Sequence, residues 1–381
     1  MAIGLDVTHP MDVVETDLGG MPQGGWPARL IAGVLLGGGL LVLLGVVSPL
    51  DASRIGYAFI FAIVGISMRV LLGLLGQISL GHQAFVGIGA FMAGFVVTEL
   101  ELDFAMAVPA AALSGAAAAL ILGGAALRIG GLLLALVTLT FGAVAERTIF
   151  LLRQFTGGGS GLPAPRPPWA ATDTTYAYVC LAFLVIVLFL DWRFVSTKAG
   201  RAVQAVRDSE RVAASMGISV IKYKLLAFML SGFLAGLAGG LLAFNIGTVQ
   251  AAPFNFFLAL EFVLMTVVGG LQYRSGVVAG SMFFALLDRY FGNIYDWFLR
   301  QLDKVPGIRG VSDFLRDAIA DPGLLVPAVG AGLLILTLIS FPGGIGQQLR
   351  PIVNWFRGGR FDLSLIHGET TSQGGSEDVR P

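Results

Sequence analysis

Charged residues are scarce in this chain. Only 13% of its 381 residues are Asp, Glu, Lys or Arg, whereas soluble domains carry roughly 25%. Apolar residues make up 56%, and the mean hydropathy is +0.82. The 24 basic residues balance the 24 acidic ones, so no net charge favours nucleic acid or anionic lipid. This composition excludes an ordinary soluble domain and predicts an integral membrane protein.

Cysteine and histidine are nearly absent. The single cysteine, Cys180, lies in an apolar run, which excludes an intramolecular disulfide and a redox-active thiol pair. The three histidines, His9, His82 and His367, are far apart in the sequence and show no zinc-type spacing. No nucleophile with a neighbouring base and no pair of catalytic carboxylates can be assembled. We therefore predict no metal site, no cofactor in this chain and no enzymatic activity.

Long apolar runs are abundant and predict an all-α membrane protein of about ten transmembrane helices, since a span needs roughly 20 residues. The runs are Leu30–Val47, Ile55–Leu75, Ala84–Val97, Ala105–Leu127, Gly131–Leu152, Tyr176–Leu190, Leu225–Phe244, Phe257–Leu271, Gly276–Tyr290 and Gly323–Phe341. We expect a transmembrane domain over residues 29–346, between polar tails at 1–28 and 347–381. A charged external loop is expected at 291–322.

Glycine is frequent, with 53 residues. In a bilayer, small residues four positions apart let two helices approach closely. This spacing occurs at Gly33 and Gly37, at Gly232, Gly236 and Gly240, and at Gly276 and Gly280. The sequence therefore predicts helix contacts at these positions.

The polar stretch 191–224 orients the chain. It carries seven Lys or Arg residues and three acids between apolar runs. The positive-inside rule places such a loop in the cytoplasm. With an even number of spans, both termini are then cytoplasmic as well.

Within this stretch, residues 201–217 have the pattern of one amphipathic helix. Apolar side chains recur at spacings of three and four, at Ala202, Ala205, Val206, Val212, Ala213 and Met216. Gly217 can supply the left-handed conformation that ends a helix. The helix is too polar to span, so it is either a connector lying on the membrane surface or a helix that docks into a groove of another protein.

A second unusual stretch is GQISLGHQAF, Gly76–Phe85, where two glycines enclose Gln77, Ser79 and His82 in an apolar region. The glycines interrupt the helix pattern. The stretch is either a tight cytoplasmic turn or a broken helix that lines a translocation path, because irregular backbone at membrane depth needs protein or water around it.

Few charges fall inside the apolar runs. Glu146 and Arg147 lie near the outer end of the fifth run and can reach the interface. Arg69 and Glu261 lie deeper. Each can form an internal ion pair or a hydrogen bond to backbone, or can respond to a zwitterionic substrate.

The glycine-rich stretch TGGGSGL, Thr156–Leu162, lacks the Lys-Ser/Thr pair of a phosphate loop, so a nucleotide site is excluded here. The predicted topology places it outside.

Several stretches together resemble the integral membrane subunits of ABC importers for branched-chain amino acids, more closely the longer of the two paired permeases. They are GQISLGHQAFVGIGAF, VTLTFGAVAERTIF, TGGGSGL, VVGGLQYRSGVVAG and the run from Gly200 to Ala243. The Glu-Ala-Ala pattern of importers in general, followed by three residues and Gly, is only partly present as Arg211, Val212, Ala213 and Gly217, which is usual in this branch. One stretch departs from the family pattern, because Tyr273 and Arg274 stand where the family often has Gly-Ser or Gly-Thr.

The resemblance implies that residues 201–217 form the coupling helix, inserted into an ATP-hydrolysing subunit. The residues expected to couple to the ATPase are Arg201, Gln204, Arg207, Asp208, Glu210, Arg211 and Gly217. The candidates for the translocation path are Gly76, Gln77, Ser79, Gly81, His82, Arg69 and Glu261. Implied partners are a second homologous permease, two ATP-binding subunits and a soluble periplasmic or extracellular substrate-binding protein, which TGGGSGL would face.

The expected function is therefore a multi-pass permease of the bacterial inner membrane that passes branched-chain or related amino acids, with ATP hydrolysed by partner subunits. Urea or short amides are alternative substrates within the family. An ion-coupled secondary carrier is the alternative from another class, although such carriers use carboxylate or histidine relays that are scarce here.

Overall fold

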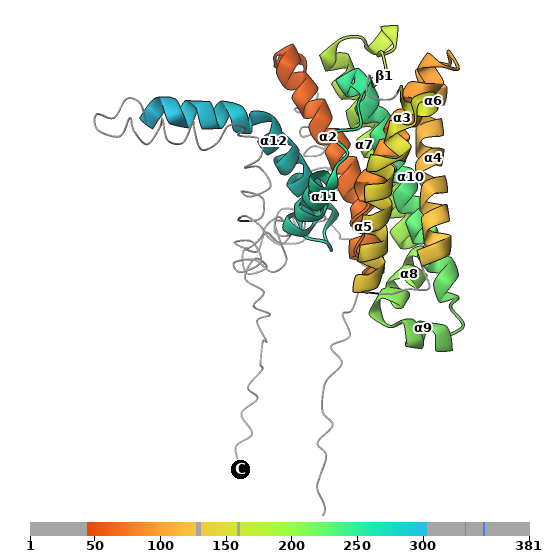
Figure 1. The fold of residues 1–381 in the computed structure, drawn as a ribbon. Coiled ribbons are helices and arrows are strands. Elements are labelled where there is room, and N and C mark those ends of the chain that lie inside the picture. The colour runs from red at the N-terminus through yellow and green to blue at the C-terminus, as the bar shows by residue number, and fades with distance from the viewer. Residues whose placement is uncertain (1–43, 127–130, 158–160, 303–331, 333–345, 347–381) are drawn as a thin grey trace, which may run out of the picture.

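The computed structural model describes residues 44–126, 131–157, 161–302, 332 and 346, which form a bundle of apolar helices (Figure 1). Five helices are long and apolar enough to cross a membrane, and three shorter apolar helices, His82–Thr98, Phe256–Gly269 and Arg274–Leu287, accompany them. These helices correspond to predicted spans. The runs at 30–47 and 323–341 lie almost wholly outside the described residues, as do both predicted tails, so the number of ten stays a prediction.

Along the chain the helical elements are α2 (Pro49–Arg69), the π-helix η1 (Val70–Leu75), α3 (His82–Thr98), α4 (Phe104–Ala126), α5 (Leu132–Arg147), η2 (Ile149–Leu151), α6 (Arg153–Thr156), η4 (Pro168–Ala170), α7 (Asp173–Ser196), α8 (Lys198–Asp208), α9 (Glu210–Ser215), α10 (Val220–Ile246), α11 (Phe256–Gly269) and α12 (Arg274–Leu302). Two short strands, β1 (Leu162–Pro163) and β2 (Thr248–Val249), pair antiparallel. At two residues each, they are too short for the sequence pattern to reveal.

The centre of the bundle is the crossing of α10 with α3 and α4, and glycines make it possible. A Cβ added at Gly239 would overlap the backbone oxygen of Val86, and one added at Gly236 would overlap α4. Gly276 and Gly280 likewise lie against Gly269. The predicted contacts at these glycines are confirmed, because close backbone approach leaves no room for a side chain. Gly33 and Gly37 lie outside the described residues.

The connections gather at two opposite ends. The helices α8 and α9 lie at one end, and the β1–β2 pair with α6 lies at the other (Figure 1). The turn at residues 76–81 belongs to the first end, because Gly76 lies against Arg207 of α8. The described loops thus alternate between the ends as the predicted topology requires.

Two predicted boundaries are wrong. The stretch 191–224 is not a loop throughout, because α7 continues to Ser196 and α10 begins at Val220. Both helices continue through a charged residue that is buried against the bundle. Asp191 in α7 is 1% exposed and Lys224 in α10 is 3% exposed. The predicted external loop at 291–322 is also helical at its start, since α12 runs on to Leu302 without a glycine or proline after Gly292 to end it.

Candidate functional site

The helices α8 and α9 replace the single amphipathic helix predicted for residues 201–217. Ser209 has extended backbone (φ −161°, ψ 113°), and its side chain accepts a hydrogen bond from the Val212 N–H. This is an N-cap, so Ser209 ends α8 and starts α9. The break turns the second half of the segment away from the first. Gly217 adopts the left-handed conformation (φ +79°), as predicted for a residue that ends a helix.

The break divides the apolar face. On α8, Ala202, Val203 and Val206 are buried against the bundle. On α9, Ala213 is buried, whereas Val212 is 52% exposed and Met216, just beyond the helix, is 73% exposed. Arg201, Arg207, Asp208 and Arg211 are exposed, and Gln204 is half-buried. One end of the chain therefore carries a charged surface with two exposed apolar side chains.

Glu210 fixes α9 to the bundle. Its carboxylate lies 2.6 Å from the Lys224 Nζ of α10, and the Lys224 side chain is only 4% exposed. A buried ammonium requires such a partner, because desolvation without one is costly.

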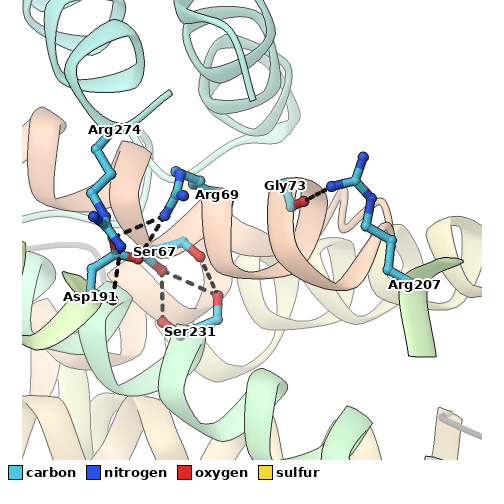
Figure 2. A network of polar contacts seen from close by, with 7 residues as sticks. All are labelled: Ser67, Arg69, Gly73, Asp191, Arg207, Ser231 and Arg274. Carbon is cyan, nitrogen blue, oxygen red and sulfur yellow. Dashed lines mark hydrogen bonds and ion pairs between the residues drawn. The ribbon is translucent and has the colours of Figure 1, made fainter. Parts of the chain in front are cut away.

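Arg207 links α8 to the end of α2. Its Nη1 donates a hydrogen bond of 2.7 Å to the backbone oxygen of Gly73, within the π-helix η1 (Figure 2). A π-helix is a rare widening of an α-helix that often marks functional sites. Gly76 then turns the chain with φ +72°, and a Cβ there would lie 2.9 Å from the Arg207 Cγ. The Arg207 side chain therefore contacts both Gly73, which is inside η1, and Gly76, the left-handed residue that follows η1.

A buried charge cluster lies one turn earlier on α2. Arg69 donates from Nη1 to both carboxylate oxygens of Asp191, at 2.8 and 2.9 Å. Arg274, at the start of α12, pairs with the same carboxylate (Figure 2). The cluster joins α2, α7 and α12 and holds two guanidinium groups against one carboxylate. The internal ion pair predicted for Arg69 is therefore present, with Asp191 as its partner.

The turn at residues 76–81 connects η1 to α3, and its polar side chains are buried although Gly76 and Ile78 are exposed. Gln77, Ser79 and His82 are 8%, 1% and 0% exposed. The Leu80 N–H donates to the Thr138 hydroxyl of α5 at 2.9 Å, and a Cβ at Gly81 would overlap the Thr138 backbone oxygen. Of the two structures open to the sequence, the described chain has the turn, and α5 and α8 pack against part of its irregular backbone.

His82 takes part in a polar contact between α2 and α10. The hydroxyls of Ser67 and Ser231 each donate to the other's backbone oxygen, at 2.7 and 2.8 Å. Because the Ser67 proton is used in this way, the 2.7 Å contact with the His82 Nε2 requires the histidine to donate. Figure 2 shows the serine pair beside the charge cluster. His82 thus contributes a hydrogen bond to the junction of three helices.

Comparison with known families decides the class of this chain. The model of the family described as the branched-chain amino acid transport system permease component matches residues 52–314. The chain belongs to this family. It is a multi-pass membrane protein, and the resemblance expected from the sequence motifs is confirmed.

The permease has curated relatives of moderate similarity. It is 29% identical over 275 residues to the high-affinity branched-chain amino acid transport system permease protein LivM of Escherichia coli K12, covering 64% of this chain and 65% of the relative. It is 28% identical over 201 residues to the autoinducer 2 import system permease protein LsrC of E. coli O9:H4, covering 52% of each. Among solved structures, PsaBC from Streptococcus pneumoniae in complex with Fab aligns with a TM-score of 0.41 at 15% identity, over 85% of this chain and 99% of that chain.

The structure gathers most of the predicted site residues of the permease at one end. Arg207, Gly76, Gln77 and Ser79 are close together, and Arg69 lies one turn away along α2. Glu261 is instead in the middle of α11 and half-buried. Sequence reasoning missed Asp191, Ser67, Ser231 and Thr138. Asp191 could have been predicted as a partner of Arg69. It is an acid directly after an apolar run, and a lone arginine inside another apolar run needs an opposite charge.

Proposed function

We propose that this chain is a permease subunit of an ABC importer, and that it forms a translocation path for branched-chain amino acids together with a second homologous permease. Two ATP-binding subunits would hydrolyse ATP, and a soluble binding protein would deliver the substrate. The observation that carries this proposal is the charged pair α8–α9, which projects at one end of an apolar bundle and contacts the π-helix through Arg207.

The α8–α9 surface supports docking better than a membrane-surface connector. Its buried face already contacts the bundle, and its outer face combines exposed cations with Val212 and Met216. A helix that fits a groove presents apolar anchors with charges around them. The predicted coupling residues Arg201, Gln204, Asp208, Glu210, Arg211 and Gly217 would lie in or beside this contact.

Two contacts carry motion from α8 into the bundle in this proposal. Arg207 holds the Gly73 oxygen, and Asp191, just before α8 on α7, holds Arg69. Arg69, which donates to Asp191, and Gly73, which accepts from Arg207, are one helical turn apart on α2 and η1, so a displacement of α8 would move the end of α2 and the turn at 76–81 together. That turn would then open or close the path at this end, as alternating access requires.

The proposed location is the bacterial inner membrane, with α8, α9 and both termini in the cytoplasm. The basic residues of the 191–224 stretch support this orientation. The substrate class rests on the family and on the similarity to LivM.

The test is uptake by proteoliposomes that contain the complete complex. Leucine uptake should require ATP inside and the binding protein outside. Uptake driven by an ion gradient without ATP would contradict the proposal, and uptake of urea or another solute in place of leucine would correct the substrate class.

The role of Arg207 is tested by the ratio of leucine transported to ATP hydrolysed. We expect Arg207→Ala to lower this ratio by about fivefold or more, the usual range for coupling between sites. Lys198→Ala is the matched control, because Lys198 is an exposed cation on the same helix. An unchanged ratio in Arg207→Ala would remove the proposed contact from the mechanism.

A further inference from the structure

A cavity of about 170 Å³ lies at the end of the bundle opposite α8, between α3 and the segment that follows α5. One wall comes from α3, with Ile88, Met92 and Phe95. The other comes from η2 and α6, with Ile149, Phe155 and Thr156. None of the polar contacts at the α8 end touches it. It is therefore a separate feature of the permease.

A break in the chain builds this cavity. Thr148 leaves helical geometry (φ −126°, ψ −61°) and ends α5, so that η2 and α6 fold over α3. Phe150 fills the back of the cavity and is 1% exposed. It reaches this position because Gly87 of α3 has no side chain: a Cβ there would overlap the Phe150 ring.

The described part of the lining suits apolar groups. Among the described lining residues Thr156 alone is polar, and its hydroxyl already donates to the Leu152 backbone oxygen at 2.8 Å. None of these described side chains is free to bind an ammonium, a carboxylate or an amide. The volume resembles that of apolar cavities of about 150 Å³ that hold a molecule of benzene. An aliphatic group of four carbons fits such a space, whereas a polar solute such as urea would lose its hydrogen bonds there.

Charges lie next to the cavity in the sequence. Arg147 ends α5 and Arg153 begins α6, so the two exposed arginines flank the wall formed by η2. Thr156, at the other end of α6, begins the stretch TGGGSGL at this same end of the molecule. Two cations therefore lie within a few residues of the cavity lining along the chain.

We infer that this cavity is the site that receives the aliphatic side chain of a branched-chain amino acid after its release from the binding protein, with the zwitterionic part remaining outside it. The inference rests on the proposed function and adds a physical basis for the substrate class. The cavity selects by apolar contact, and each methylene group that fits contributes about a fourfold preference.

The direct test is photo-crosslinking of the complete complex with photo-leucine, a leucine analogue that carries a diazirine in its side chain. Peptides that contain Met92 and Phe95, or Ile149 and Phe155, should be labelled. An excess of leucine should remove the label, and an excess of urea should not. Labelling of these peptides that leucine fails to compete would indicate an acyl chain as the occupant and would overturn the inference.

Variants that change the cavity volume give a second readout. Ile88→Trp should fill the cavity and lower leucine uptake about tenfold, the scale of steric discrimination in apolar pockets, while the complex still hydrolyses ATP. Met92→Ala should enlarge it and shift the preference from leucine towards phenylalanine. Ile121→Trp is the matched control, since Ile121 is 75% exposed on α4, outside the cavity.

The two proposals fail in different ways. If the wild-type complex shows ATP-driven leucine uptake but labelling occurs elsewhere and Met92→Ala keeps the wild-type preference, this inference is wrong and the proposed function stands. If the wild-type complex shows no ATP-driven leucine uptake, the proposed function falls and this inference falls with it.

Discussion

The helices α2 and α7 have nearly the same hydropathy and opposite environments. Their most apolar windows have mean hydropathies of 2.3 and 2.2, yet 94% of the first is buried inside the chain and only 22% of the second. In water, such apolar surfaces would both be driven inside. In a bilayer, lipid is as apolar as leucine, so hydropathy reveals that a helix spans and not where it lies in the bundle.

The difference follows from shape and polarity. The α2 helix has Gly56 and Gly65 where α7 and α12 approach, and Ser67 and Arg69 find partners inside. The α7 helix instead exposes Val185, Ile186 and Phe189. Only a narrow face of it is buried, from Tyr176 and Cys180 to Asp191, which meets the two arginines. Substitutions at buried positions, such as those of α2, should therefore destabilise the protein more than substitutions on the exposed face of α7.

The largest effect is expected at the buried acid of α7. Asp191→Asn leaves Arg69 and Arg274 without a carboxylate, and removing one partner of a buried pair costs about 4 kcal/mol. Arg193→Gln, two residues away and exposed, is the control and should change stability by less than about 0.5 kcal/mol. Thermal unfolding in detergent measures both, and equal effects would refute the role of the cluster.

A direct comparison of the two helices uses one substitution. Phe59 of α2 is 1% exposed and Phe189 of α7 is 58% exposed. Phe59→Ala should destabilise the protein by about 3 kcal/mol through the cavity that it leaves. Phe189→Ala should cost less than about 0.5 kcal/mol. The same unfolding assay checks this pair, and a large loss in Phe189→Ala would show that α7 is covered by a partner in the sample.

Substitutions at the glycines where helices cross should cause a loss of stability of intermediate size. Gly239→Val forces α10 away from Val86 of α3, and overpacking of this kind costs about 2 kcal/mol. Gly124→Val is the matched control on α4, because nothing lies within 4 Å of a Cβ at Gly124. Size-exclusion profiles of both variants after graded heating give the comparison. Equal thermal tolerance would show that the crossing can widen without loss.

The smallest effect is expected between α8 and α9. Ser209→Ala removes the cap of α9 and should cost about 1 kcal/mol of local stability. Ser209→Asp keeps an acceptor at the same place and serves as the control. Hydrogen exchange of the Val212 and Ala213 amides measures the change. If exchange is the same in all three proteins, the break has another cause.

The segments of the candidate site could be selected from the sequence. The motif Gly76–Phe85 and the basic stretch, which the structure brings to one end of the molecule, were conspicuous because glycines and polar residues are rare company in an apolar run. The partner of Arg69 was not predictable in detail, since Asp191 is 122 residues away. The break at Ser209 was missed because the apolar spacing continues across it, while capping depends on local backbone geometry.

The sequence by itself determined that this chain spans a membrane by helices, which family it belongs to and which segment is the polar one. These features depend on local composition and on motifs, which the order of residues contains directly. Only the tertiary structure decided which apolar helices are central, which carboxylate neutralises Arg69, and that Arg207 reaches the π-helix. These depend on side chains from distant segments meeting in one place, and in a bilayer no difference in hydropathy distinguishes a protein neighbour from lipid.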